Sequence, residues 1–240
     1  MRADIRRVIG AAGAIDGEEA GQWISVSDLM AGLMMVFLLI AVALMRYALM
    51  ERDRIMEIAV AYQDTKIAIY EALMEEFEAD LERWDARLNR ESLEFEFQSP
   101  EVLFETGKVE LRPKFKQILK EFFPRYLKVL RPFREAIEEV RIEGHTSSVW
   151  NRSTPKDLAY YLNMELSQGR TRSVLWFVYR LPEVSADREW ITRYLVAVGY
   201  SSSRLRLKPD GTEDRERSRR VSFRVVTNAD VKIRKILEGG

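Results

Sequence analysis

The sequence predicts an α+β membrane protein, in which one N-terminal transmembrane helix continues into a helical stalk and then into an α/β sandwich-like domain. Three observations support this fold class. A long apolar run lies near the N-terminus, from Leu29 to Met45. No glycine or proline interrupts the chain between Gly32 and Pro100, so one helix can leave a membrane and continue beyond it. After Asn89, short runs of alternating apolar residues take turns with helical stretches.

The composition excludes several function classes. Lys plus Arg and Asp plus Glu each total 38, so the net charge is zero and no global field draws the chain to nucleic acid. The absence of cysteine and the single histidine leave no thiolate or histidine cluster for a metal. Residues 105–108 form a turn that lacks the first glycine of a phosphate loop, and residues 199–203 lack the closing glycine of a nucleophile elbow. We therefore expect neither an enzyme nor a bound cofactor.

The apolar segment is expected to form a transmembrane helix at residues 23–47, after a cytoplasmic segment at residues 1–22. The 17 apolar residues give about 26 Å of helix, short of the ~30 Å hydrocarbon core, so the span begins before them. Trp23 and Tyr47 lie roughly 36 Å apart along such a helix and suit the two membrane interfaces. A cleaved signal peptide is the rival interpretation, but the run is longer than a usual signal and charged residues follow it at once.

Asp28 is the only charged residue from Ala20 to Met45 and would lie about 7 Å inside Trp23. A carboxylate at that depth costs about 2.5–3.5 kcal/mol, so it normally has a partner or serves a proton pathway. We interpret Asp28 as an ion-binding residue. The alternative is a helix N-cap at the membrane edge, beside Ser25 and Ser27.

Residues 48–91 are expected to form a helical linker or stalk. Apolar residues recur there at three- and four-residue steps, at Ile55, Ala59, Tyr62, Ile69, Leu73, Phe77, Leu81, Trp84 and Leu88. This stripe needs a partner, either the chain's own globular domain or the same stripe of a second copy in a parallel coiled coil. Lys66 interrupts the stripe, and leucine and isoleucine do not dominate it, so we expect a dimeric stalk of modest strength.

Residues 92–228 are expected to form the globular domain, with a C-terminal tail at residues 229–240. Helices are predicted near Pro113–Leu130 and Asp157–Leu181. Strands are predicted where apolar residues alternate, at Leu93, Phe95 and Phe97, at Val140 and Ile142, and at Val221, Phe223 and Val225.

Five pieces of this domain form a recognisable signature. They are Leu103-Phe104-Glu105-Thr106-Gly107 with Leu111, Ile142-Glu143-Gly144-His145-Thr146, Asn163 with Leu166-Ser167 and Arg170, Gly199-Tyr200-Ser201, and Arg219-Arg220-Val221-Ser222-Phe223. In this order and spacing they resemble the peptidoglycan-binding domain shared by OmpA, Pal and the flagellar stator protein MotB. The resemblance covers roughly the last 140 residues and implies an OmpA/MotB-like fold.

The same resemblance implies a wall-binding site. In that family an aspartate after the Gly-His-Thr piece and the arginine of the Asn-x-x-Leu-Ser-x-x-Arg piece hold the diaminopimelate of the stem peptide. Here the arginine is Arg170, but Ser147 stands where the aspartate is expected. The residues expected in the site are Thr146, Ser147, Asn163, Leu166, Ser167, Arg170 and Arg219. Alternatively, Arg170 is a helix-surface arginine paired with a carboxylate such as Glu165. His145 is expected to bond within its own turn.

A second resemblance concerns the membrane segment. Asp28-Leu29-Met30, the run from Gly32 to Phe37 and the piece Gly144-His145-Thr146-Ser147-Ser148 are similar to those of the ZorB family, the stator-like subunits of the Zorya anti-phage defence system. That match also accounts for Ser147.

The ZorB resemblance implies a homodimer inside a pentamer of a larger, ZorA/MotA-like membrane protein, with Asp28 binding the transported H⁺ or Na⁺. It also implies a single-pass protein of the bacterial inner membrane, with a cytoplasmic N-terminus and a periplasmic domain that binds peptidoglycan. Basic residues flank the span on both sides, so charge alone does not fix this orientation. A flagellar MotB-type stator subunit and a purely structural cell-wall anchor remain as alternatives.

Overall fold

The computed structural model describes residues 4–98, 103–228 and 230–231, with side chains from residue 27 onward except those of residues 55 and 57–63. The chain divides into two compact units, Met1–Glu57 and Ile58–Gly240. The side chains of the predicted cytoplasmic segment and of Trp23 lie outside the described residues, as does the predicted tail apart from residues 230–231.

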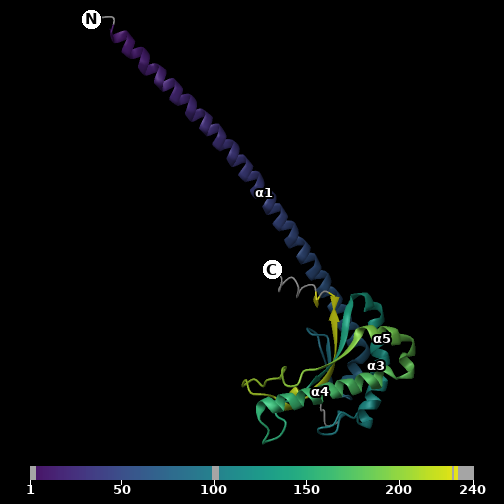
Figure 1. The fold of residues 1–240 in the computed structure, drawn as a ribbon. Coiled ribbons are helices and arrows are strands. Elements are labelled where there is room, and N and C mark those ends of the chain that lie inside the picture. The colour runs from purple at the N-terminus through teal and green to yellow at the C-terminus, as the bar shows by residue number, and fades with distance from the viewer. Residues whose placement is uncertain (1–3, 99–102, 229, 232–240) are drawn as a thin grey trace. The chain divides into compact units, whose positions relative to one another are not determined.

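The first unit contains most of helix α1, which extends over Asp4–Leu81 (Figure 1). Within it, Ser27–Arg54 is a 28-residue stretch whose apolar 18-residue window has a mean hydropathy of 2.4, and none of that window is buried. A core helix of a soluble protein with this composition would be mostly buried, whereas here large apolar side chains such as Leu29 and Met34 are exposed. The stretch therefore has the length and composition of a membrane span.

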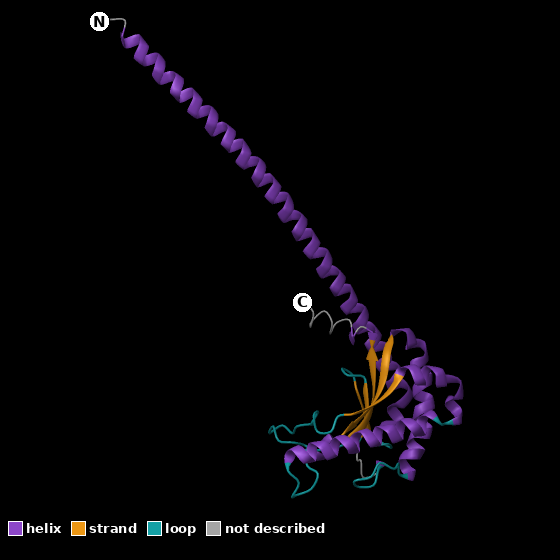
Figure 2. Ribbon diagram, viewed as in Figure 1, coloured by secondary structure: helices purple, strands orange, loops and turns teal. Residues whose placement is uncertain are grey.

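The second unit is built around a five-stranded sheet with the strand order β1-β2-β5-β3-β4 (Figure 2). The strands are β1 (Ala86–Asn89), β2 (Glu94–Phe97), β3 (Ile137–His145), β4 (Leu195–Gly199) and β5 (Arg220–Thr227). All neighbouring pairs are antiparallel except β3 and β4, which are parallel. Because a parallel pair needs a crossover connection, a helix is expected between these two strands in the chain.

That crossover contains α4 (Lys156–Tyr179), followed by the short helices η2 (Pro182–Asp187) and α5 (Arg188–Tyr194). Other helices among the described residues are α3 (Pro113–Leu130), η1 (Arg131–Ala136) and α6 (Arg215–Ser218). Helices and a mixed sheet confirm the predicted α+β class, and α3 and α4 match the two predicted helices. The strands β1 and β4 and the helices η1, η2, α5 and α6 were not predicted, because each is too short to show a clear period.

The two faces of the sheet differ completely, because successive side chains of a strand point to opposite sides. On one face, aromatic side chains of β2 and β5 pack against α3. Phe122 of α3 lies at the centre, with ring centroids of Phe95, Phe97 and Phe223 at 4.7, 5.1 and 5.1 Å. The opposite face carries the charged side chains described below.

The end of α1 belongs to this core. Ile69, Leu73 and Phe77 are fully buried in it, and Trp84 follows them just after the helix ends. Their spacing of four residues places them on one helical face, which therefore packs on the chain's own domain. The globular unit accordingly starts before residue 92, inside the segment expected to be a stalk. The side chains of Ile55, Ala59 and Tyr62 lie outside the described residues, so a dimeric stalk stays a prediction for the earlier part of the stripe.

Candidate functional site

A cavity of about 300 Å³ lies beside α4 where β3 ends. Its walls come from four parts of the chain: the segment before α3, the loop after β3, α4, and the residue just before β5. The residues that line it are Phe104, Thr106, Gly107, Thr146, Ser147, Val149, Trp150, Asn163, Leu166, Arg170 and Arg219.

Two glycines bring α4 against the ends of the parallel strands. A Cβ atom on Gly144 of β3 would lie 2.7 Å from the Ser167 carbonyl oxygen, and one on Gly199 of β4 would lie 2.5 Å from the Gln168 nitrogen. Both clashes are with backbone atoms of α4, so any larger residue would force the helix away from the sheet. The glycines of two signature pieces thus set the position of the helix that carries Asn163, Leu166 and Arg170.

Ser201 fixes the loop after β4 to the same helix. It is fully buried and adopts a left-handed conformation with φ 51°. Its N–H donates to Ser167 Oγ at 3.1 Å, its hydroxyl donates to the Tyr160 carbonyl at 2.8 Å, and its carbonyl accepts from the Thr146 N–H at 2.9 Å. These three hydrogen bonds hold Thr146, one of the residues that line the cavity, at a fixed distance from α4.

Arg170 connects α4 to the turn on the opposite side of the cavity. Its Nε donates to the Lys108 carbonyl at 3.0 Å and its Nη2 to the Glu105 carbonyl at 3.3 Å. Its guanidinium also lies 4.7 Å above the ring of Phe104. Arg170 is only 9% exposed, so it is not a helix-surface arginine. The turn it holds contains Gly107 at φ 71°, a conformation that favours glycine.

The loop after β3 supplies uncharged polar groups. The Thr146 hydroxyl is buried and has no hydrogen-bond partner among the described residues, although it lines the cavity. Asn163 Nδ2 donates to the Ser147 carbonyl at 3.2 Å, and the Ser147 hydroxyl donates to the Val149 carbonyl at 3.4 Å. A cavity with two arginines and such hydroxyl groups suits a ligand that carries a carboxylate.

The structure brings together six of the seven residues expected in the site: Thr146, Ser147, Asn163, Leu166, Arg170 and Arg219. Ser167 does not line the cavity. It lies on the face of α4 that packs on the strand ends, where its hydroxyl donates to the Met164 carbonyl at 3.0 Å and accepts from Ser201. The lining residues that sequence reasoning missed are Phe104, Thr106, Gly107, Val149 and Trp150. Phe104, Thr106 and Gly107 belong to the first of the five signature pieces, and that membership was the signal by which the sequence could have placed them in the site.

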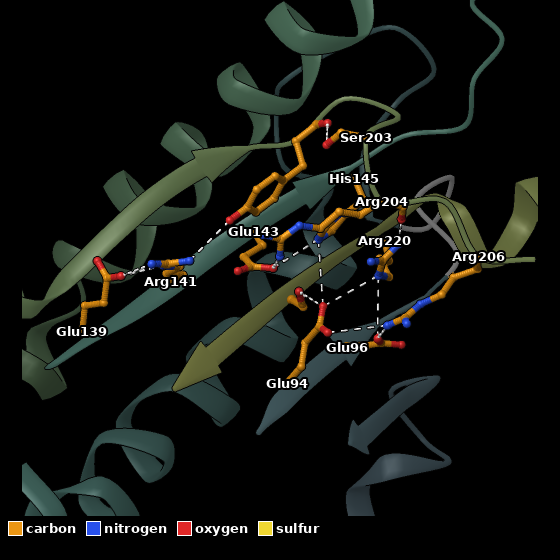
Figure 3. Close-up of polar contacts among 12 residues, drawn as sticks. Glu94, Glu96, Glu139, Arg141, Glu143, His145, Ser203, Arg204, Arg206 and Arg220 are labelled. Atoms are coloured by element: carbon orange, nitrogen blue, oxygen red, sulfur yellow. Dashed lines mark hydrogen bonds and ion pairs between the residues drawn. The ribbon is translucent and has the colours of Figure 1, made fainter. Parts of the chain in front are cut away.

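The polar face of the sheet holds a cluster of buried charged side chains (Figure 3), and none of them is among the residues that line the cavity. Glu94 and Glu96 of β2, Glu143 and His145 of β3, and Arg220 of β5 are all buried there. Two arginines of the β4–β5 loop neutralise these carboxylates. Arg204 Nη1 lies 3.5 Å from Glu143 Oε2, and Arg206 Nη2 lies 3.5 Å from Glu94 Oε2 and also contacts Glu96. These ion pairs hold the loop against the sheet, because removing one partner of a pair leaves the other partner's charge buried and uncompensated.

The potential ligand atoms of Glu94, Glu143 and His145 lie within 4.8 Å of one another, as in many metal sites. Arginines already supply the positive charge that a metal would bring, however, since Arg220 Nε lies 3.7 Å from Glu94 and Arg204 lies against Glu143. We therefore assign no metal here.

His145 does not bond within a turn, in contrast to the prediction. It is the last residue of β3, its ring stacks on Tyr200 at 5.2 Å, and its Nε2 lies 3.4 Å from Glu143 and 3.9 Å from Glu94. Burial lowers the pKa of His145, assisted by the nearby Arg220 and opposed by the two carboxylates.

This shift predicts how stability depends on pH. The folded protein takes up the proton less readily than the unfolded chain, whose histidine has a pKa near 6.5. The contribution of His145 is therefore complete above about pH 6.5 and is lost as the pH falls below it. Urea unfolding at about pH 7.5 and about pH 5.5 should show a smaller acid-induced loss in His145→Gln than in the wild type.

The wild type must be compared with His145→Gln because Glu96 changes the stability in the opposite direction. Burial and Glu94 raise the pKa of Glu96, so its contribution to the free energy of unfolding increases as the pH falls. Equal pH dependence in the two proteins would contradict the assignment to His145.

Taken together, the apolar span and the cavity define a class: an α+β domain with a cavity beside one helix, in a chain whose N-terminal helix is long and apolar enough to cross a membrane. No protein-family model matches the chain. The chain is 51% identical over 216 residues to Zorya protein ZorB of Escherichia coli, which covers 90% of this chain and 92% of that protein. The chain therefore belongs to the ZorB family.

Solved structures similar to this chain include a putative MotB-like protein from Desulfovibrio vulgaris, 23% identical, which covers 68% of this chain and 94% of that one with a TM-score of 0.47. Another is the cell wall anchor of the T6SS from Pseudomonas aeruginosa, 20% identical, which covers 65% of this chain and 97% of that one with a TM-score of 0.44.

Proposed function

We propose that this chain is an ion-conducting, stator-like subunit of the bacterial inner membrane that is anchored to peptidoglycan and acts with a larger membrane partner in anti-phage defence. The observation that carries the proposal is the cavity beside α4. Six of the expected residues, two of them arginines, come together there from distant parts of a ZorB-family chain, in an arrangement that suits a wall-peptide carboxylate.

The membrane half of the proposal rests on Asp28. It stands at the start of the Ser27–Arg54 stretch, and Gly32 one turn later leaves open space where another helix could approach. A carboxylate at such a place needs a protein partner or an exchangeable ion. We propose that Asp28 binds the passing H⁺ or Na⁺ inside a pentamer of a ZorA/MotA-like protein that surrounds a homodimer of this chain. The N-terminus is then cytoplasmic and the second unit periplasmic.

The wall half rests on Arg170, with Thr146 and Ser147 beside it. A planar guanidinium can hold a carboxylate through two parallel hydrogen bonds, which a lysine cannot do. The buried Thr146 hydroxyl lacks a partner among the described residues, and a ligand in the cavity would supply one. Asn163, Leu166 and Arg219 complete the proposed site, while Ser167 contributes only by holding the loop that follows β4.

Two other functions, a purely structural wall anchor and a flagellar stator subunit, fit the chain less well. A purely structural wall anchor would need no acid in its membrane helix, so Asp28 favours the ion-carrying subunit. A flagellar stator subunit would also use a membrane acid and a wall-binding domain, but the relationship to a Zorya protein favours the defence role.

Replacing Arg170 by alanine is expected to weaken binding of the full-length protein to isolated sacculi by about ten- to a hundredfold. A charge-assisted hydrogen bond contributes roughly 1.5–3 kcal/mol, which corresponds to that range. Arg170→Lys should recover only part of the affinity, because an ammonium lacks the planar fork. Detergent-solubilised protein is sedimented with sacculi at two salt concentrations.

Arg172→Ala is the matched control, since Arg172 lies on the same helix but is exposed and outside the cavity. Thermal unfolding of each variant separates lost binding from a loosened turn at Glu105–Lys108. If all four proteins are retained equally by sacculi, Arg170 does not bind the wall.

A further inference from the structure

The loop after β3 forms one wall of the cavity beside α4. Ser147, Val149 and Trp150 line the cavity, whereas Ser148, which stands between them, is not among the lining residues. The Ser148 N–H donates to Glu213 Oε1 at 2.9 Å, and the Ser148 hydroxyl donates to Glu213 Oε2. One carboxylate therefore accepts two hydrogen bonds from the residue in the middle of this wall.

The contact between Glu213 and Ser148 is suited to fixing the main chain. The Glu213 side chain is 16% exposed and Ser148 is half-buried, so few water molecules compete for these hydrogen bonds. A hydrogen bond to a carboxylate is about twice as strong as one between neutral groups. Because the peptide units on both sides of Ser148 are planar and rigid, holding its N–H also restricts where Ser147 and Val149 lie.

Glu213 stands on a hairpin, residues 206–214, within the loop between β4 and β5. It forms an antiparallel bridge with Leu207, and the Asp214 N–H donates to the Arg206 carbonyl at 2.8 Å. Arg206 attaches the hairpin to the polar face of the sheet, because its Nη2 lies 3.5 Å from Glu94 Oε2. The carboxylate that holds Ser148 is therefore carried by a segment that is itself fixed to the sheet.

The loop between β4 and β5 reaches the cavity at two further points. Arg219, at the end of the loop, lines the cavity, and the carbonyl of Ser201, near its start, accepts from the Thr146 N–H at 2.9 Å. We propose that Glu213 is a positioning residue of the wall-binding cavity, which holds the loop after β3 in place through Ser148. Glu213 acts on Ser148 and is not among the residues that line the cavity. This inference rests on the proposed wall-binding function and adds a residue to its site.

Replacing Glu213 by alanine is expected to weaken binding of the detergent-solubilised full-length protein to isolated sacculi by about three- to tenfold. The loop after β3 then leaves its position for part of the time, and the apparent affinity falls with the fraction that stays in place. Glu213→Gln should bind more tightly than Glu213→Ala, because its amide oxygen still accepts from the Ser148 N–H. Glu216→Ala is the matched control, since Glu216 is an exposed acid of the same loop, and it should bind like the wild type.

Two further measurements separate positioning from a general loss of stability. Ser148→Ala removes the hydroxyl donor and keeps the N–H, so it should weaken binding less than Glu213→Ala. Added to Glu213→Ala, it should cause little further loss, because both substitutions remove the same contact. Hydrogen exchange of residues 146–150, followed by mass spectrometry, should be faster in Glu213→Ala than in the wild type and in Glu216→Ala. Thermal unfolding shows whether each variant is folded.

The inference and the proposed function fail in different ways. Wild-type binding by Glu213→Ala, or additive losses from Glu213→Ala and Ser148→Ala, overturns the positioning role. If Arg170→Ala weakens binding while Glu213→Ala does not, wall binding stands and only the role of Glu213 falls. If the wild type itself is not retained by sacculi, the proposed anchoring falls and the inference falls with it. If Glu213→Ala does not fold, the same comparisons are made with Glu213→Gln and Ser148→Ala.

Discussion

Replacing Asp28 by asparagine is expected to abolish ion flux and phage protection while leaving expression and assembly intact. Asparagine has nearly the same shape as aspartate, so the substitution removes the titratable charge and little else. On the proposed mechanism Asp28 is the only acid between Ala20 and Met45, so its loss leaves no carboxylate there to bind H⁺ or Na⁺. Asp28→Glu keeps the carboxylate but moves it by one methylene, so partial activity is expected.

The matched control is Asp53→Asn, which makes the same change on the same helix. Asp53 is exposed near the other end of the stretch, 3.9 Å from its neighbour Arg52, and surface pairs of this kind contribute little. Plaque assays and ion-flux measurements are made on both variants at matched expression. Normal protection by Asp28→Asn would remove the ion-carrier assignment and leave a structural wall anchor.

Replacing Phe122 by alanine is expected to lower the free energy of unfolding of the second unit by about 3–5 kcal/mol. Phe122 is fully buried and joins α3 to β2, β5 and the end of α1, since its ring also lies 5.2 Å from that of Phe77. Removing its side chain leaves a cavity that the surrounding aromatic rings cannot move together to fill. The loss is measured by urea unfolding, followed by tryptophan fluorescence.

Trp176→Ala is the control for Phe122→Ala, because Trp176 is a large aromatic residue of α4 that is 61% exposed. Its removal should change the unfolding free energy by no more than about 0.5 kcal/mol. Similar unfolding midpoints for the two variants would contradict the central position of Phe122 in the core.

Much of the fold followed from sequence periodicity. The helices α3 and α4 have long patterns, and β2, β3 and β5 alternate clearly, so each was predicted near its observed place. The strand β1 was missed because its four residues continue the helical stripe, in which Leu88 fits either period. The strand β4 was missed because its four apolar residues follow a short helix without a turn signal.

The site was predictable only in part. Motif order identified six cavity residues, but it could not show that Ser167, in the same motif, faces the sheet instead. The charged face was not predicted at all. Its members Glu94, Glu143 and Arg220 meet only because β5 pairs with both β2 and β3, and that pairing of distant segments is not visible in the linear pattern.

The central claim is that the cavity beside α4 holds a carboxylate of the cell wall. It is tested most directly by an experimental structure of the full-length protein with a saturating stem peptide. The account predicts a peptide carboxylate within about 2.7–2.9 Å of the Arg170 guanidinium, with Thr146 Oγ1 hydrogen-bonded to the same ligand. A peptide bound at another surface, or an empty cavity at saturation, would contradict the account.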